Sequence, residues 1–364
     1  MSTCPSLGLE VFMFLVYVLI AVGILLMMIV IHEYGHYVAG KALGFKITEF
    51  SIGFGPKVFG RTLKNGEKFS LRIIPLGGYC AFYDENGTEQ TKEFKSFVDH
   101  APYKRIIVLL SGVVFNFLSA IIFAFIFLSV VGYSVPTVQS LAIDPVTQSP
   151  YAEQLQVGDV VQSVNGKPLD IMYTWTDAMN TDTSDDAQFE LIVVRIVDNQ
   201  STEISVTVRR KSIYNSSTGN SYKGLGFNAG NKQIKVSGWK AASNSLPLTL
   251  KFSGMILGSF GDMISGKAPI SEMTGPISTV TGIAQSAVVN AQILLLMLPL
   301  IAANLAIFNL LPLPALDGSR IVFALIEWIR GKPINREVES VIHFVGFVVL
   351  VGGVILLEIV RVIT

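Results

Sequence analysis

The chain has 364 residues, of which 51% are hydrophobic and only 15% are charged, and its formal net charge is +0. Soluble domains usually carry about 25% charged residues, so this composition, with a mean hydropathy of +0.54, indicates a membrane protein. The balanced charge leaves no basic surface for nucleic acid. The cysteines, Cys4 and Cys80, are too few and too far apart to predict a disulfide framework.

Four stretches are long and apolar enough to cross a bilayer, for which about 20 residues suffice. They cover residues 11–31, 106–131, 293–311 and 340–357. The first is too long for the core of a signal peptide and follows no basic residue, so we expect it to be retained. In an alternative topology, one of the four is a re-entrant segment.

The distribution of Lys and Arg predicts how these spans are oriented. Residues 41–105 hold eleven of them, and the connection between the third and fourth spans is also basic. We therefore expect both connections in the cytoplasm. The N-terminus, the C-terminus and the long segment between the second and third spans are expected outside, in a multi-pass protein of the plasma membrane.

Residues 50–74 have the pattern of a β-hairpin. Asn65-Gly66 separates two apolar runs, and turns of this kind require positive φ at both central residues. The hairpin is either a soluble cap on the cytoplasmic face or a sheet edge that dips into the membrane and pairs with an extended substrate. The sequence leaves both interpretations open.

Residues 135–230 are predicted to form an α+β module, with a second Asn-Gly turn at 165–166 and a strand pair over 189–197 and 203–209. The module resembles a PDZ domain in residues 149–152, 157–159 and 164–166. Gly224 to Phe227 resembles the loop with which PDZ domains bind a terminal carboxylate. Residues 239–264 are expected to form an amphipathic helix on the outer membrane surface or a plain linker helix.

The first span ends in His32-Glu33-Tyr34-Gly35-His36. On a helix, His32 and His36 lie on one face, one turn apart, so both imidazoles can reach a single Zn²⁺. Glu33 can take a proton from a zinc-bound water, the role that the HExxH motif assigns to it in metalloproteases. Such groups in a bilayer are costly and usually functional.

A catalytic zinc needs a third protein ligand. His100 lies in the first basic connection, and His343 is more readily explained as a packed residue of the fourth span. Asp317 is the better candidate, because it is the first charge after forty-four uncharged residues and lies at the depth expected for His32 and His36. Prolines before Asp317 interrupt the helix, which allows its carboxylate to turn inward.

Together, HExxH in the first span and Asn-x-x-Pro-x-x-x-Leu-Asp-Gly at 309–318 resemble the site-2 protease family of intramembrane zinc metalloproteases. Because it has a PDZ-like insert between its second and third spans, the chain resembles the bacterial members of this family that cleave anti-sigma factors. Other motif matches are Gly112 and Asn116, residues 274–277 and residues 77–79. The resemblance implies zinc bound by His32, His36 and Asp317, Glu33 as the catalytic base, and a substrate backbone held by Asn304 and Asn309.

The expected activity is therefore hydrolysis of a peptide bond within a transmembrane segment, in regulated intramembrane proteolysis. The expected partners are the lipid bilayer and single-span substrates already cut by another protease, such as anti-sigma factors or signal-peptide remnants. The alternatives are a membrane-anchored zinc peptidase that acts on soluble peptides, and a non-catalytic PDZ scaffold.

The fold class expected from the sequence is a polytopic α-helical membrane protein of about four transmembrane helices, with a membrane-associated β-hairpin and an inserted α+β PDZ-like domain. In chain order we expect a first transmembrane helix, a cytoplasmic β region, a second helix, an extracytoplasmic PDZ-like domain, a membrane-surface helical linker, a third segment, a cytoplasmic connection and a fourth helix. The four membrane segments are expected at 1–43, 104–133, 285–319 and 340–364. The cytoplasmic β region is expected at 44–103, the PDZ-like domain at 134–231, the helical linker at 232–284 and the cytoplasmic connection at 320–339.

Overall fold

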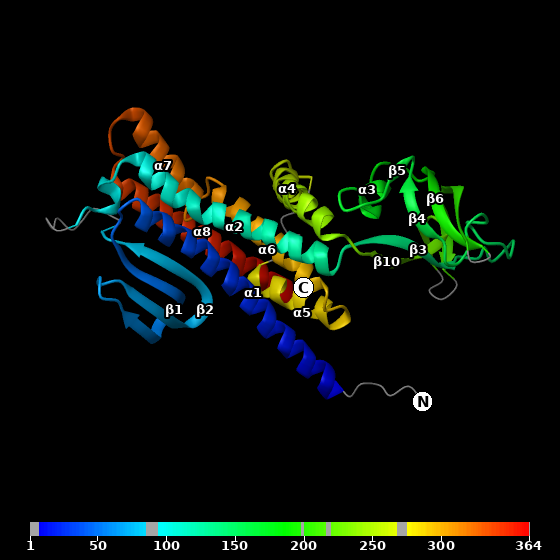
Figure 1. Cartoon of the computed structure of the whole chain (residues 1–364), viewed down its shortest axis with the longest axis horizontal. Coiled ribbons are helices and arrows are strands. Elements are labelled where there is room, and N and C mark those ends of the chain that lie inside the picture. Colours follow the sequence, from blue (N-terminus) through cyan, green and yellow to red (C-terminus); the bar gives the residue numbers. More distant parts are fainter. Residues whose placement is uncertain (1–6, 85–93, 198–199, 216–219, 268–274, 364) are drawn as a thin grey trace. The chain divides into compact units, whose positions relative to one another are not determined.

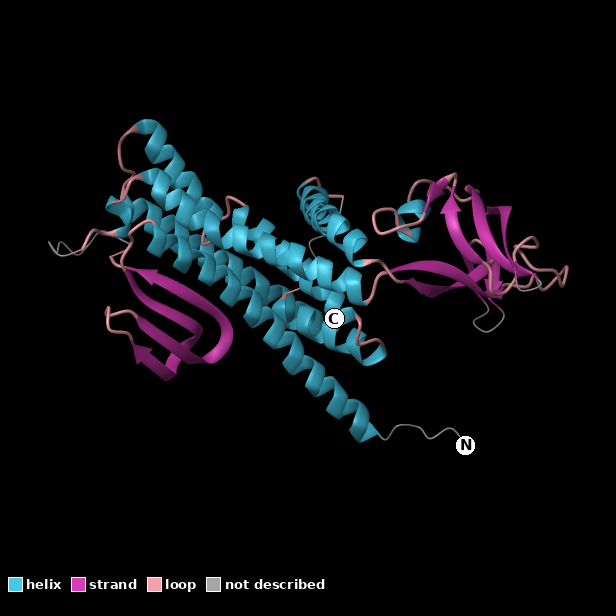
Figure 2. Ribbon diagram, viewed as in Figure 1, coloured by secondary structure: helices cyan, strands magenta, loops and turns pink. Residues whose placement is uncertain are grey.

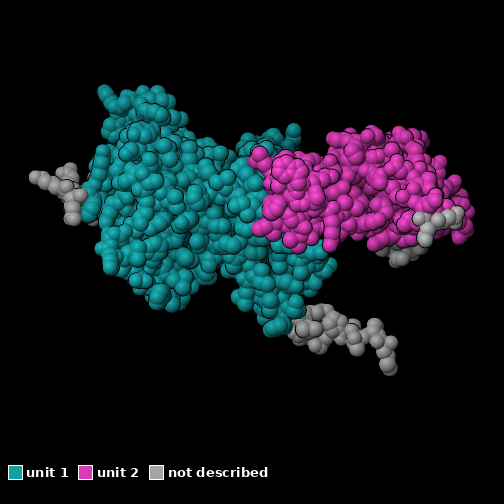
Figure 3. Space-filling view, in the orientation of Figure 1, with its two compact units in different colours: residues 1–124, 249–364 teal, residues 125–248 magenta. Residues whose placement is uncertain are grey.

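A computed structural model of the chain describes residues 7–84, 94–197, 200–215, 220–267 and 275–363. The chain forms two compact units (Figure 3). One comprises residues 1–124 together with 249–364, and the other comprises residues 125–248. The first unit contains the long apolar helices, and the second is largely β structure (Figure 2).

Four helices of the described chain are long and apolar enough to cross a membrane. They are α1 (Leu7–Ala42), α2 (Pro102–Val130), α6 (Ile293–Leu310) and α8 (Arg336–Ile363). An α-helix rises 1.5 Å per residue, so even the 18 residues of α6 span about 27 Å, close to the thickness of the hydrocarbon core. The four predicted spans all lie within or at the ends of these helices, and the chain is a multi-pass membrane protein.

Small side chains bring the helices of the first unit close together. Ala21 of α1 is fully buried in the same core as Ala302 and Ala303 of α6. Gly35 of α1 lies so near α2 that a methyl group there would sit 2.5 Å from the carbonyl oxygen of Ser111. Small residues allow such close packing in membranes, where the hydrophobic effect does not drive helices together.

A shorter apolar helix, α5 (Pro276–Val289), packs against α1 and α6. Its residues Val280 and Ile283 are buried in the same core as α1. Near the other end of the chain, the carboxylate of Glu358 in α8 accepts hydrogen bonds from the backbone nitrogen and hydroxyl of Ser278 at 3.0 and 2.7 Å. Part of α5 falls in the range where we expected a surface linker, and α4 (Gly238–Ile264) precedes it.

The backbone leaves helical geometry between α6 and α7 (Asp317–Arg330). Pro312 and Pro314 lie in this break, and Ala315 has a φ of 77°. The Ala315 backbone nitrogen donates a hydrogen bond to Nδ1 of His343 in α8 (3.2 Å). Gly318 packs against the carbonyl oxygens of Leu310 and Leu311, so the start of α7 lies against the end of α6.

The predicted hairpin is an antiparallel pair, β1 (Ile47–Thr62) and β2 (Lys68–Phe82), which packs against α1 (Figures 1 and 2). Its turn differs from the prediction: Gly66 has a φ of 83°, whereas Asn65 does not have a positive φ. The cause is loop length. Five residues separate the strands, and the bond from Gly66 N to Leu63 O closes a turn in which only the last position is left-handed.

The second unit is built around a six-stranded antiparallel sheet of order β10-β3-β4-β6-β7, with β5 paired to β4. Phe189, Leu191 and Val193 alternate along β6 and are fully buried in its core. A two-stranded sheet (β8–β9) and the helix α3 complete the unit. The strands are β3 (Tyr133–Leu141), β4 (Val160–Val164), β5 (Lys167–Pro168), β6 (Gln188–Val197), β7 (Gln200–Arg209), β8 (Lys211–Asn215), β9 (Asn220–Gly224) and β10 (Phe227–Ile234), and α3 is Trp175–Met179.

The Asn165-Gly166 turn has positive φ at both residues, whereas the Asn65-Gly66 turn does not. Asn165 and Gly166 have φ values of 50° and 74° and form a two-residue connection between β4 and β5. A two-residue hairpin of this type requires left-handed geometry at both positions. Further along, Leu225 and Gly226 lie between β9 and β10.

Candidate metal centre and active site

His32 and His36 lie on one face of α1, as their spacing predicts. Their Nε2 atoms are 3.1 Å apart, and each residue is only 7% exposed. The rings meet edge to face, with centroids 4.7 Å apart. Both imidazoles therefore present a nitrogen to the same small volume inside the helical unit.

Asp317, the first residue of α7, completes this cluster although it lies 285 positions from His32. Its Oδ2 is 2.9 Å from Nε2 of His32 and 3.2 Å from Nε2 of His36. Within the described chain, these three residues form a group able to hold a metal ion, with ligand atoms within 4.8 Å of one another. The helix break at Pro312 and Pro314 supplies the turn that brings the carboxylate to α1.

The chemistry and spacing of these donors fit zinc. Zinc takes nitrogen and oxygen ligands at about 2.0–2.2 Å in tetrahedral geometry, which places neighbouring donor atoms about 3.3 Å apart. The distances of 2.9–3.2 Å among the three donor atoms are close to this value. Three protein ligands leave a fourth position for water or substrate.

The second ring nitrogen of His36 has a partner that fixes its tautomer. His36 Nδ1 donates to the carbonyl oxygen of Val108 in α2 at 2.8 Å. The proton on Nδ1 leaves the lone pair on Nε2, the atom that faces the cluster.

His32 is held in a similar way by Asn116 of α2. Asn116 is fully buried, its Nδ2 lies 3.2 Å from His32 Nδ1, and its Oδ1 has no hydrogen-bond partner in the described chain. A half-turn of the amide exchanges these two atoms without moving any other group. The oxygen then accepts from His32 Nδ1–H, and Nε2 keeps its lone pair for a metal.

Gly112 allows α2 to pass directly beside both imidazoles. A Cβ at this position would lie 2.6 Å from His36 Nε2 and 2.7 Å from His32 Cε1. Gly112 and Asn116 match the family motif, but the sequence alone indicates no role for either. In the structure, the missing side chain of Gly112 leaves room for the two imidazole rings, and Asn116 is a hydrogen-bond partner of His32.

Glu33 faces both the metal cluster and the antiparallel pair β1–β2, which we call the ribbon. Its Oε2 accepts a hydrogen bond from the backbone nitrogen of Cys80 in β2 at 2.9 Å, and it interacts electrostatically with all three residues of the cluster. Gly78 approaches Glu33 closely, since a Cβ there would be 3.6 Å from Glu33 Cγ. Sequence reasoning did not identify the Cys80 amide, because a backbone donor leaves no mark in residue type.

A polar network fixes the middle of the ribbon. Glu49 of β1 accepts from Arg72 Nη2 and from the Tyr79 hydroxyl, both at 2.9 Å. Burial raises the pKa of Glu49, but the hydrogen bonds from Arg72 and Tyr79 outweigh it and hold this pKa below its ordinary value. The network holds β1 and β2 together close to the segment that contacts Glu33.

The two asparagines predicted to bind substrate lie on α6. Asn304 is exposed and Asn309 is half-buried, and neither forms a hydrogen bond with the cluster in the described residues. Asn309 directly precedes Leu310, whose carbonyl lies against Gly318, so it is close to the start of α7. The remaining histidines lie elsewhere: His100 stacks on Phe45, and His343 accepts from Ala315.

This arrangement, three zinc-compatible donors and a neighbouring glutamate on membrane-crossing helices, defines a membrane metalloprotease that uses zinc. The chain belongs to Peptidase family M50, whose family model matches residues 20–353. It is 26% identical to zinc metalloprotease RasP of Geobacillus kaustophilus, covering 88% of this chain and 91% of that protein. It is 27% identical to RasP of Bacillus licheniformis (86% and 91%) and 32% identical to a Synechocystis protein provisionally named a zinc metalloprotease (93% of each).

Proposed function

We propose that the protein hydrolyses peptide bonds within transmembrane segments of other membrane proteins. The observation that carries the proposal is the location of the donor set: two donors lie on α1, a helix able to cross the membrane, and the third lies directly after α6, another such helix. A peptidase of soluble peptides has no need to bury its metal ligands in such helices, where polar groups are costly.

In this proposal His32, His36 and Asp317 are the zinc ligands. Val108 and Asn116 orient the two imidazoles so that their Nε2 lone pairs face the ion. Bound zinc supplies a Lewis acid that polarises the scissile carbonyl and lowers the pKa of water.

Glu33 is the proposed general base and acid. It takes a proton from the attacking water and delivers it to the nitrogen of the departing amine. The hydrogen bond from Cys80 holds one carboxylate oxygen in place, which leaves the other available for this proton. The positioning of Glu33 thus depends on the β1–β2 ribbon as well as on α1.

The ribbon is also the proposed docking place for substrate. A helix protects its carbonyl groups by internal hydrogen bonds, so a substrate helix must unwind before it is cut. Phe54, Ile73 and Ile74 of the ribbon expose apolar side chains where β1 and β2 shift register. An unwound segment can add there as a strand, while Asn304 and Asn309 bind its backbone amides.

The second unit is proposed to act as a PDZ-like gate outside the membrane, with both chain termini on the same side and the zinc site toward the cytoplasm. It admits substrates only after another protease has removed a bulky outer domain. Anti-sigma factors and signal-peptide remnants are the proposed substrate types, in regulated intramembrane proteolysis.

A single-span reporter with a short outer tail tests the proposal when it is co-expressed with wild type, with Glu33→Gln or with Glu337→Gln, an exposed control glutamate of α8. Wild type and the control are expected to cut the reporter inside its span, and Glu33→Gln is expected to leave it intact. Efficient cleavage of the same sequence as a soluble peptide, with the inserted reporter spared, would instead support a membrane-anchored peptidase of soluble peptides.

A further inference from the structure

Six residues, 311–316, connect α6 to α7, and their path decides where Asp317 lies, because Asp317 is the first residue of α7. Within this connection Ala315 has a φ of 77°. A residue with a Cβ is strained in this left-handed region, which glycine enters freely. Strain of this kind persists only where the surrounding structure holds it. The turn that directs the third proposed metal ligand therefore needs support from another part of the protein.

Helix α8 provides this support through His343. The backbone nitrogen of the strained residue, Ala315, donates a hydrogen bond to His343 Nδ1 at 3.2 Å. The backbone nitrogens of Leu313 and Leu316 are bonded within the connection itself, and the two prolines have no N–H to donate. The bond from Ala315 thus ties the turn to a separate helix.

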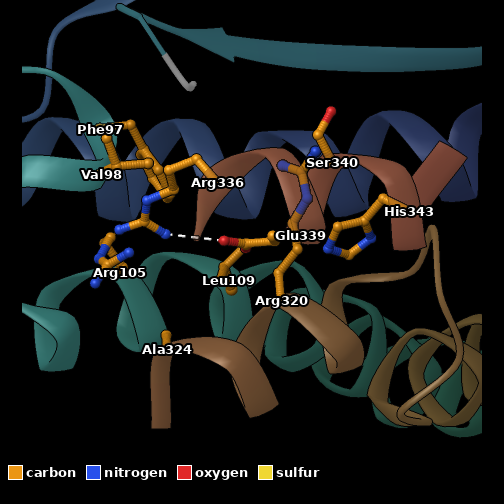
Figure 4. A pocket seen from close by; sticks show the side chains of 10 residues that line it. All are labelled: Phe97, Val98, Arg105, Leu109, Arg320, Ala324, Arg336, Glu339, Ser340 and His343. Carbon is orange, nitrogen blue, oxygen red and sulfur yellow. Dashed lines mark hydrogen bonds and ion pairs between the residues drawn. The ribbon is translucent and has the colours of Figure 1, made fainter. Parts of the chain in front are cut away.

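Contacts with α7 orient the His343 ring. The ring meets Phe323 edge to face, with centroids 5.6 Å apart. Together with Arg320 and Ala324 of α7, His343 also lines a pocket (Figure 4). Because Nδ1 accepts from Ala315, the proton of the neutral ring lies on Nε2. The ring therefore presents an acceptor to the turn, and a side chain without an acceptor cannot replace it.

Gly346 allows α8 to come this close to the turn. It follows His343 by three positions, so the two residues lie on one face of α8. A Cβ at Gly346 would overlap the side chain of Pro314. Helix α8 thus presents two neighbouring positions to two consecutive residues of the turn, a glycine against Pro314 and a hydrogen-bond acceptor against Ala315.

We propose that His343 and Gly346 are positioning residues for the metal centre, which act by holding the turn at Ala315 so that Asp317 reaches the two histidines of α1. This inference rests on the proposed function, in which Asp317 is a zinc ligand. Helix α8 thereby takes part in building the site although the three proposed ligands lie on α1 and α7.

The narrow tolerance of a zinc site makes this support necessary. Asp317 Oδ2 lies 2.9 Å from Nε2 of His32 and 3.2 Å from Nε2 of His36. Zinc–ligand distances vary by only about 0.2 Å. A turn that relaxed toward ordinary φ values would displace the start of α7, because a change in one backbone dihedral moves every atom that follows. The carboxylate would then leave the position that it shares with the two imidazoles.

Chelator competition on the purified full chain in detergent measures zinc affinity for the variants that test this role. His343→Leu removes the acceptor, whereas His343→Asn keeps an acceptor oxygen near the place of Nδ1. Gly346→Ala forces α8 away from Pro314. Gly352→Ala is the matched control, a glycine of the same helix where, among the described residues, nothing outside the adjacent α8 backbone lies within 4 Å of a Cβ. Asp317→Ala reports whether the carboxylate is a ligand.

We expect His343→Leu and Gly346→Ala to bind zinc at least about ten-fold more weakly than wild type, the change that corresponds to loss of one hydrogen bond. His343→Asn and Gly352→Ala are expected to bind zinc nearly as tightly as wild type. Asp317→Ala is expected to lose the most affinity, because it removes a ligand and not its support.

Two further measurements separate positioning from loss of folding. With Co²⁺ in place of zinc, the visible absorption spectrum depends on ligand geometry, so it should change in His343→Leu and be restored in His343→Asn. In the metal-free protein, residues 311–316 should exchange backbone hydrogen faster in His343→Leu than in wild type, while the protection of α1 and α6 is unchanged.

The outcomes distinguish this inference from the proposed function on which it rests. If His343→Leu or Gly346→Ala binds zinc as tightly as wild type while Asp317→Ala does not, that residue has no positioning role and the metal centre stands. Wild-type affinity in Asp317→Ala would refute the metal centre and this inference with it. Equal losses in His343→Leu and His343→Asn would exclude the hydrogen bond as the cause, and equal losses in Gly346→Ala and Gly352→Ala would exclude the contact with Pro314.

Discussion

Replacement of Gly112 by alanine should strongly weaken zinc binding without unfolding the helical unit. The added Cβ would lie 2.6 Å from His36 Nε2, where ordinary contacts begin at 3.4 Å, so the ring must move by about 0.8 Å. Zinc–ligand distances tolerate only about 0.2 Å of variation. Because a Cβ there also meets His32 Cε1 at 2.7 Å, one methyl group disturbs two proposed ligands.

We expect the zinc affinity of Gly112→Ala to fall by at least about 100-fold, which corresponds to ~2.7 kcal/mol. Metal content is measured after equilibration with a competing chelator, and thermal unfolding of the metal-free protein reports on folding. Gly23→Ala is the control, because in the described part of the chain nothing beyond the adjacent backbone of α1 lies within 4 Å of a Cβ at this position. If Gly112→Ala holds zinc as tightly as the control, the proposed cluster is not the zinc site.

Three further predictions concern the partners of the site. Asn116→Ala should weaken zinc binding about 10- to 100-fold by leaving His32 Nδ1 without a partner, and an unchanged chelator competition curve would exclude this role. Glu358→Ala should destabilise the protein by about 1–3 kcal/mol, since Ser278 loses two hydrogen bonds at the start of α5; chemical denaturation measures this, and an unchanged midpoint contradicts it. Because the folded pKa of Glu49 is lowered, its stabilisation of the ribbon is present above the ordinary glutamate pKa and is lost as pH falls. Glu49→Gln should therefore reduce hydrogen-exchange protection of β2 at neutral pH, with the difference from wild type shrinking in acid, and a difference independent of pH would refute this origin.

The sequence predicts best what local spacing controls. His32 and His36 share a helix face because they are four positions apart, and the apolar stretches predict membrane helices because few charges interrupt them. The depth of Asp317 in the membrane and the prolines before it predict that it lies near the two histidines. Its contact with both imidazoles is a tertiary fact that requires the helix break to turn in one particular direction.

The sequence indicates less about groups whose role depends on how the helices and strands pack together. The Cys80 amide is a backbone donor, and Asn116 reaches His32 only because α1 and α2 approach closely at Gly112. The Asn65-Gly66 turn shows that even a strong local motif depends on loop length.

The central claim is that this zinc site cuts substrates inside the membrane, and the position of the cut tests it most directly. Purified wild type and Glu33→Gln are reconstituted in liposomes with a single-span substrate, and the products are identified by mass spectrometry. We predict wild-type fragments that end within the apolar span, absent with Glu33→Gln and absent when zinc is chelated. Fragments that end only outside the span, or that appear equally with Glu33→Gln, would contradict the account.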